Sequence, residues 1–182
     1  SGLVILPWND ISLLKERLAR GDIAGVIMEP AMCNSGAISP EPGFLEEAKE
    51  ACEKNGSLLI FDETITGFRL APGGAQERFG VTPHLATFAK AMANGYQVAA
   101  ITGPADLMEL FASGGVLHGG TYNSQLQSMA AAVETLKTVS APGFHAALET
   151  KTQKLHEGVE KAFRDQSIDV SLNSYSGFMH VG

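Results

Sequence analysis

The sequence lacks most features of secreted and membrane proteins. Only two of its 182 residues are cysteine, and Cys33 and Cys52 have the spacing of neither a disulfide framework nor a metal site. We therefore expect two reduced thiols and a cytoplasmic protein. No apolar run approaches the roughly 20 residues that a membrane-spanning helix needs, and the first residues lack the basic end of a signal peptide.

Positive charge is also scarce in this chain. Thirteen Lys and Arg residues face 20 Asp and Glu residues, which gives a formal net charge of -7 at pH 7. This balance argues against nucleic acid or an anionic membrane surface as a partner. With 45% hydrophobic and 18% charged residues, the composition is that of a globular chain able to bury a core of ordinary size.

Amphipathic segments alternate with short apolar runs along the chain. This alternation is typical of an α/β fold whose strands form a largely parallel sheet. The opening residues, 3–8, also look like a strand. Residues 63–83 are predicted to form a long loop, and loops of this length are uncommon unless functional. The pattern predicts helices over residues 10–20, 43–55, 104–112, 124–140 and 144–165, and strands over residues 23–28, 57–62, 85–90, 97–102 and 169–181.

The spacing of apolar residues also predicts which face of a helix is buried. In the helix at 43–55 the inner residues are Phe44, Leu45, Ala48, Ala51 and Cys52. In the helix at 124–140 they are Leu126, Met129, Ala130, Val133 and Leu136.

Two of the apolar runs end in a single charged residue, Asp62 after residues 57–61 and Lys90 after residues 85–89. Buried charges are costly unless compensated, and the carboxyl edge of a parallel sheet is where its ligands bind. A lysine that holds an aldehyde as an imine and a carboxylate that keeps a pyridine nitrogen protonated are what pyridoxal phosphate catalysis requires. Taken singly, each residue is more often a cap, an ion-pair partner or a solvated strand end.

Six short motifs together resemble the class III aminotransferases, near glutamate-1-semialdehyde aminomutase. The resemblance runs from about residue 10 to residue 182, and the motifs keep the family's order. It implies the partial large domain of a fold type I pyridoxal-phosphate transferase over residues 1–140, and the start of a small α+β C-terminal domain over residues 141–182. The motifs are Glu29-Pro30, Leu59-Ile60-Phe61-Asp62-Glu63, Thr66-Gly67-Phe68-Arg69, Gly80-Val81-Thr82-Pro83, Phe88-Ala89-Lys90-Ala91 and Gly119-Gly120-Thr121.

The resemblance also implies a cofactor, pyridoxal 5'-phosphate, and two catalytic residues. Lys90 matches the family's Schiff-base lysine, which then moves a proton between substrate and cofactor. Asp62 matches the carboxylate that faces the pyridine nitrogen. Thr64 stands where the family usually has a valine that packs on one face of the ring.

Three further residues match cofactor-binding positions of the family. Thr121, with the amide of Gly120, matches the site that binds the cofactor phosphate of a neighbouring subunit, which implies a homodimer. The same residues could form an ordinary helix cap. Asn34 matches an asparagine of the aminomutase-like members, near the phenolic oxygen of the cofactor, although a loop asparagine commonly satisfies its own turn.

Three other polar residues accompany the motifs. We expect Glu29 to bond within its own loop. Arg69 could pair with Glu63 or Glu29, and we expect it to be a structural rather than a catalytic residue. His84 is expected to be a hydrogen-bonded structural residue.

The activity implied by the resemblance is transfer of an amino group between an amine or amino acid and a keto acid or aldehyde. One alternative is the 2,1-aminomutase reaction, which uses the same residues and returns the amino group to the same carbon skeleton. The other is a catalytically inactive fragment that only oligomerises through uncovered apolar surfaces.

Parts of the family's fold have no counterpart in this sequence. They are the upstream loop that grips the cofactor phosphate, the aromatic residue that stacks on the ring, and the rest of the small domain. We therefore expect a fragment that keeps Lys90 and Asp62 but binds pyridoxal phosphate weakly or not at all. A stable imine absorbance with near-stoichiometric cofactor after dialysis would contradict this expectation.

Overall fold

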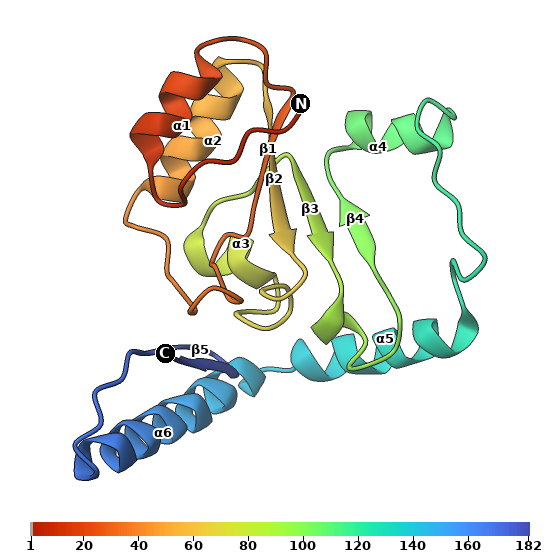
Figure 1. Ribbon diagram of the computed structural model, residues 1–182. Helices are drawn as coiled ribbons and strands as arrows, with labels where there is room; N and C mark the ends of the chain where they lie inside the picture. Colours follow the sequence, from red (N-terminus) through yellow and green to blue (C-terminus); the bar gives the residue numbers. More distant parts are fainter. Residues whose placement is uncertain (1) are drawn as a thin grey trace.

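The computed structural model describes residues 2–182 and contains a four-stranded sheet flanked by helices (Figure 1). The strands lie in sequence order; β1, β2 and β3 are parallel, and β4 is antiparallel to β3. The expected α/β fold with a mostly parallel sheet is therefore confirmed. The bounds are β1 (Gly25–Met28), β2 (Leu58–Glu63), β3 (Leu85–Phe88) and β4 (Ala100–Thr102).

The predicted helices are all present, within a few residues of their expected ends. They are α1 (Ile11–Leu18), α2 (Phe44–Lys54), α4 (Ala105–Ala112), α5 (Leu126–Val139) and α6 (Phe144–Asp165), and a 3₁₀ turn, η1 (Lys90–Met92), follows β3. Within residues 2–182, no helix combines the length and the apolar character that crossing a membrane would require.

The core lies between the sheet and the helix pair α1 and α2. Asp10 begins α1, because its Oδ1 accepts a hydrogen bond from the amide of Leu13 at 2.9 Å. On α2, every residue predicted to face inward is buried, so that prediction is confirmed. These side chains pack against Leu59 and Phe61 of β2, and burying a side chain as large as Phe61 contributes about 1.5–3 kcal/mol.

Three predictions about local structure were wrong. Residues 3–8 are not one of the strands of the structure, which begin with β1 at Gly25. The loop at 63–83 contains a helix, α3 (Gly74–Phe79), of six residues, too short to show an amphipathic period. The final strand is instead a hairpin of β5 (Leu172–Tyr175) and β6 (Phe178–Val181), which turns at Gly177 with φ of 70°.

The buried face of α5 was also predicted wrongly. Its buried residues are Ser128, Ala132 and Val139, whereas Leu126 is 83% exposed and Val133 50% exposed. Small side chains let α5 approach η1, against which it packs. Leu126 and Val133 point away from the rest of residues 2–182, so the helix leaves an uncovered apolar face.

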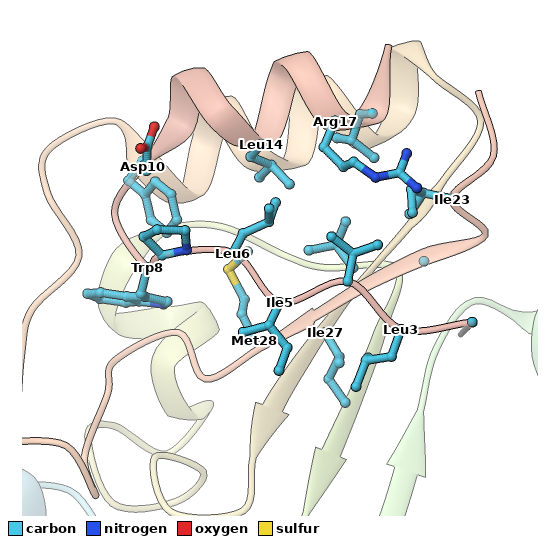
Figure 2. A pocket seen from close by; sticks show the side chains of 17 residues that line it. Leu3, Ile5, Leu6, Trp8, Asp10, Leu14, Arg17, Ile23, Ile27 and Met28 are labelled. Atoms are coloured by element: carbon cyan, nitrogen blue, oxygen red, sulfur yellow. The ribbon is translucent and has the colours of Figure 1, made fainter. Parts of the chain in front are cut away.

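A second uncovered apolar surface lies beside β1. The N-terminal segment, α1 and β1 enclose a hollow of about 300 Å³, and Figure 2 shows Leu6 and Leu14 directed toward it. At its edge, Trp8 packs on Phe44 with ring centroids 5.5 Å apart. The indole Nε1 of Trp8 donates to the backbone oxygen of Glu29 at 3.1 Å, which fixes the end of β1.

His84 attaches the start of β3 to β2, and its prediction as a structural residue is confirmed. Its backbone amide donates to the oxygen of Leu59 at 2.9 Å, and its ring Nδ1 accepts from the amide of Leu59 at 2.8 Å. Lys49 Nζ lies 3.1 Å from Nε2. Burial and then the charge of Lys49 lower the pKa of His84, since a protonated ring could not accept the Leu59 hydrogen bond.

The His84 contact predicts how stability depends on pH. Because the pKa of His84 is lower in the folded state than in the unfolded state, the unfolded chain binds an extra proton below about pH 6.5. The free energy of unfolding should therefore fall by roughly a few tenths of a kcal/mol as pH drops from neutral toward the folded pKa. Solvent screening keeps the effect this small.

The measurement is urea unfolding at pH 7.5 and pH 5.5 of the wild type and two variants. His84→Gln should reduce the pH dependence, whereas His118→Gln, on the exposed α4–α5 connection, should retain it. An unchanged pH dependence in His84→Gln would show that the ring does not couple protonation to folding.

Candidate functional site

Three polar side chains form a row across the ends of β1, β2 and β3. Asp62 of β2 pairs in register with Thr87 of β3. Met28 pairs with Phe61, so Glu29 follows directly beside Asp62. Neighbouring residues of parallel strands project from the same face of a sheet. The row therefore places two carboxylates and a hydroxyl together at the carboxyl edge, where ligands of such sheets bind.

Asp62 is a partly buried carboxylate held by two hydrogen bonds. Its Oδ1 accepts from the amide of Thr64 at 3.0 Å and from Thr87 Oγ1 at 3.2 Å. Burial alone would raise the pKa of Asp62, but these hydrogen bonds and the positive charge of Lys90 outweigh it, so the pKa is lowered. Asp62 is thus ionised at neutral pH.

Lys90 lies at the same edge, just beyond the end of β3. It begins η1 rather than closing the strand. Its side chain is exposed, whereas a buried amine was expected. Its φ of 40° is in the left-handed region, which costs a non-glycine residue energy and is often found at functional sites. Its positive charge contributes to the lowered pKa of Asp62, and at Glu29 it offsets a small part of the rise in pKa that burial causes.

Glu29 bonds within its own loop, as the sequence predicts. Its Oε2 accepts from the amide of Cys33 at 3.3 Å. Burial raises the pKa of Glu29, and the negative charge of Asp62 adds to the rise. The Cys33 thiol is fully buried and burial raises its pKa to about 11, so it is a protonated, unreactive thiol at neutral pH.

A hollow of about 410 Å³ lies beside this edge, within the range of small-molecule sites. Thr64 and Thr87, the two residues that donate to Asp62, form part of its wall. The rest is mostly apolar, with residues of β3, β4 and α4 such as Ala89, Ile101 and Phe111. The flat ring of a cofactor would find one polar side and several apolar walls here.

The other three predicted site residues lie outside this group. Asn34 is exposed in the loop after β1. Gly120 and Thr121 are exposed in the long connection between α4 and α5, beyond β4 in Figure 1. None of them lines the hollow. The chain thus brings Asp62, Lys90 and Thr64 together, and the roles of all six residues stay predictions.

Glu63 is a fully buried residue whose role the sequence interpretation missed. Its side-chain oxygens accept from Thr66 Oγ1 at 3.0 Å, the amide of Ala75 at 2.6 Å and Gln76 Nε2 at 3.0 Å. Glu63 therefore fixes the start of α3 and the loop that begins at Thr64. The alternation of strand side chains was the available signal, because it turns Glu63 away from the face of Asp62.

Arg69 is a structural residue, but it does not form the ion pair considered for it. Within residues 2–182 it makes no ion pair with Glu63 or Glu29, and its Nη1 instead donates to the backbone oxygen of Gly177 at 3.1 Å. Two more contacts attach the same hairpin to the loop after β1: Tyr175 donates to Ser39 Oγ at 2.6 Å, and Asn173 Nδ2 donates to the oxygen of Gly36 at 2.8 Å. The hairpin thus holds both loops that leave the site.

An ionised aspartate and a lysine at the carboxyl edge of a mostly parallel sheet are the two groups that pyridoxal chemistry requires. Among residues 2–182, no three His, Cys, Asp or Glu side chains are grouped as metal ligands would be. Comparison of sequences identifies the family. The profile of the aminotransferase class-III family matches residues 8–171, and the chain belongs to this family.

Individual relatives agree with the family assignment. The chain is 42% identical over 171 residues to a glutamate-1-semialdehyde 2,1-aminomutase of Desulfatibacillum aliphaticivorans, which covers 92% of this chain and 40% of that protein. Crystal structures of an ω-transaminase from Sphaerobacter thermophilus (32% identity, TM-score 0.91) and a β-phenylalanine aminotransferase from Variovorax paradoxus (31%, 0.88) each match 98% of this chain. They match it over 42% of their own length, so the chain spans about two fifths of these relatives.

The contact between Glu63 and Gly74 gives a prediction with a matched control. Gly74 and Gly80 both have φ of 71°, but a Cβ on Gly74 would lie 2.3 Å from Glu63 Oε2, whereas nothing lies within 4 Å of one on Gly80. Gly80→Ala should cost about 1–2 kcal/mol, the cost of the left-handed backbone alone. Gly74→Ala should cost at least about 1 kcal/mol more, because Glu63 cannot move without breaking buried hydrogen bonds.

Chemical unfolding of the two variants measures the difference. Equal losses of unfolding free energy would show that Glu63 can move away, and that it does not fix the loop after β2.

Proposed function

We propose that this chain carries the catalytic lysine and aspartate of a pyridoxal-phosphate-dependent aminotransferase. The reaction moves an amino group between an amine or amino acid and a keto acid or aldehyde. The observation that carries the proposal is Asp62, held ionised beside Lys90 at the sheet edge, in a chain of the class III aminotransferase family.

Each residue of the site has a distinct task in this proposal. When bound, pyridoxal phosphate supplies an aldehyde that reacts with amines and a ring that accepts electrons. Lys90 is the Schiff-base lysine, and its free amine moves the proton at the substrate carbon. Asp62 keeps the ring nitrogen protonated by its negative charge, and Thr64 packs on one face of the ring.

The remaining predicted residues complete the proposed site. Asn34 lies near the phenolic oxygen of the cofactor, and Gly120 and Thr121 bind the cofactor phosphate of a second copy. The exposure of Gly120 and Thr121 on the α4–α5 connection supports a role between subunits. The uncovered face of α5, with Leu126 and Val133, also supports a homodimer. Two free, buried thiols fit a cytoplasmic location.

Two alternatives have specific support. The aminomutase reaction is favoured by the 42% identity to a glutamate-1-semialdehyde 2,1-aminomutase. It differs in needing no second keto acid, so a substrate assay with and without an added acceptor separates the two. An inactive fragment that only oligomerises is favoured by the uncovered faces of α5 and β1. Such a fragment would associate in solution without specific attachment of the cofactor to Lys90.

Attachment of the cofactor to a particular lysine tests the proposal. The chain is incubated with excess pyridoxal phosphate and reduced with borohydride, and the pyridoxyl group is located by peptide mapping. We expect preferential labelling of Lys90, because the anionic Asp62 attracts the pyridinium of the cofactor and so holds its aldehyde near this lysine. Weak cofactor binding does not defeat this measurement, because reduction makes the attachment permanent.

Two variants serve as controls for the labelling. Lys90→Ala should remove the preferential label, and Lys15→Ala, an exposed position on α1, should leave it unchanged. Equal labelling of Lys90 and the exposed lysines would refute the assignment of Lys90 as the Schiff-base lysine.

A further inference from the structure

The two oxygens of Asp62 have different surroundings. Oδ1 accepts both hydrogen bonds that the carboxylate receives, from the Thr64 amide and the Thr87 hydroxyl. Among residues 2–182, no hydrogen bond to Oδ2 accompanies these two. A carboxylate has roughly four lone-pair sites, so Oδ2 keeps its full capacity to accept from a ligand.

We propose that Thr87 is a positioning residue, whose hydroxyl holds Asp62 Oδ1 so that Oδ2 is the oxygen that receives the protonated ring nitrogen. This inference rests on the proposed function and adds to it a residue to which neither the motifs nor the comparisons assign a role.

The position of Thr87 favours a fixed hydrogen bond over a chance contact. Thr87 is the direct register partner of Asp62, on a strand with neighbours on both sides. Its β-branched side chain has few χ1 rotamers, and it is partly buried in the wall of the hollow. Little conformational freedom is therefore lost when the hydroxyl bonds to Asp62.

The other charged groups around Asp62 do not provide this restraint. Lys90 on η1 lowers the pKa of Asp62 through its charge, but it forms no ion pair with Asp62 within 4.0 Å in the described chain. Glu29 beside β1 carries the same charge sign as Asp62 and bonds to Cys33. Thr64 contributes a backbone amide, and its side chain also helps to lower the pKa of Asp62. Thr87 adds a side-chain hydrogen bond from the neighbouring strand, at 3.2 Å.

The test measures Asp62 in the 182-residue chain without cofactor. Carbon-13 NMR of the side-chain carboxyl reports its titration midpoint, and three-bond couplings report its χ1 rotamers. Thr87→Val and Thr87→Ala should each raise the midpoint by about 0.5–1 pH unit, because a hydrogen bond to the ionised form is lost. Both should also replace a single χ1 rotamer by a mixture. Thr87→Ser keeps a hydroxyl and should stay close to the wild type in both readouts.

Thr102→Val is the matched control, because it makes the same chemical change at an exposed position of β4 whose register partner is Ala86. It should leave Asp62 unchanged. The inference is overturned if Asp62 in Thr87→Ala keeps the wild-type midpoint and rotamer, or if Thr87→Ser shifts it as far as Ala does. If Thr87→Val does not fold, the titration midpoint and rotamer of Asp62 in Thr87→Ala test the inference.

The outcome of this experiment is independent of the outcome of the lysine labelling. A shifted Asp62 in Thr87→Ala, without preferential labelling of Lys90, would support the role of Thr87 toward Asp62 and refute the proposed cofactor chemistry. Preferential labelling with an unshifted Asp62 would support the cofactor chemistry and refute the role of Thr87.

Discussion

The parallel register of β2 and β3 is the constraint on which the site depends. It pairs Asp62 with Thr87. It thereby also sets the position of Lys90, three residues after Thr87 at the start of η1, relative to Asp62. A slip of one residue would turn the side chains of β3 to the opposite face and separate these groups. His84 opposes such a slip at the other end of β3, because its backbone and its ring both bond to Leu59.

Structural features that depend on the local pattern of residues could be predicted from the sequence. The inner face of α2 is buried as its period indicates, because α2 packs on a sheet within the same chain. Asp62 and Lys90 could be predicted from the ends of two apolar runs and from the order of motifs around them. The end of an apolar run and the order of motifs both depend on residues that are near in sequence, so they could be recognised without the structure.

The remaining features depend on contacts that a local pattern does not contain. The apolar residues of α5 do recur at a helical period. However, Leu126 and Val133 face away from residues 2–182, and small residues such as Ala132 make the contact instead. Helix α3 has only six residues and is fixed by Glu63, eleven positions before its start. Thr87 reaches Asp62 only through strand pairing. The domain boundary after residue 140 and the roles of all six predicted site residues stay predictions.

The hairpin at the end of the chain has a consequence for the order of folding. Its contacts to the site loops join residues 108, 136 and 137 positions apart. Contacts between such distant residues close late, because a long loop must be ordered first. During synthesis, the sheet and its neighbouring helices can form while the hairpin is still unmade. The loops after β1 and β2 therefore reach their final arrangement only once the last residues of this sequence have left the ribosome.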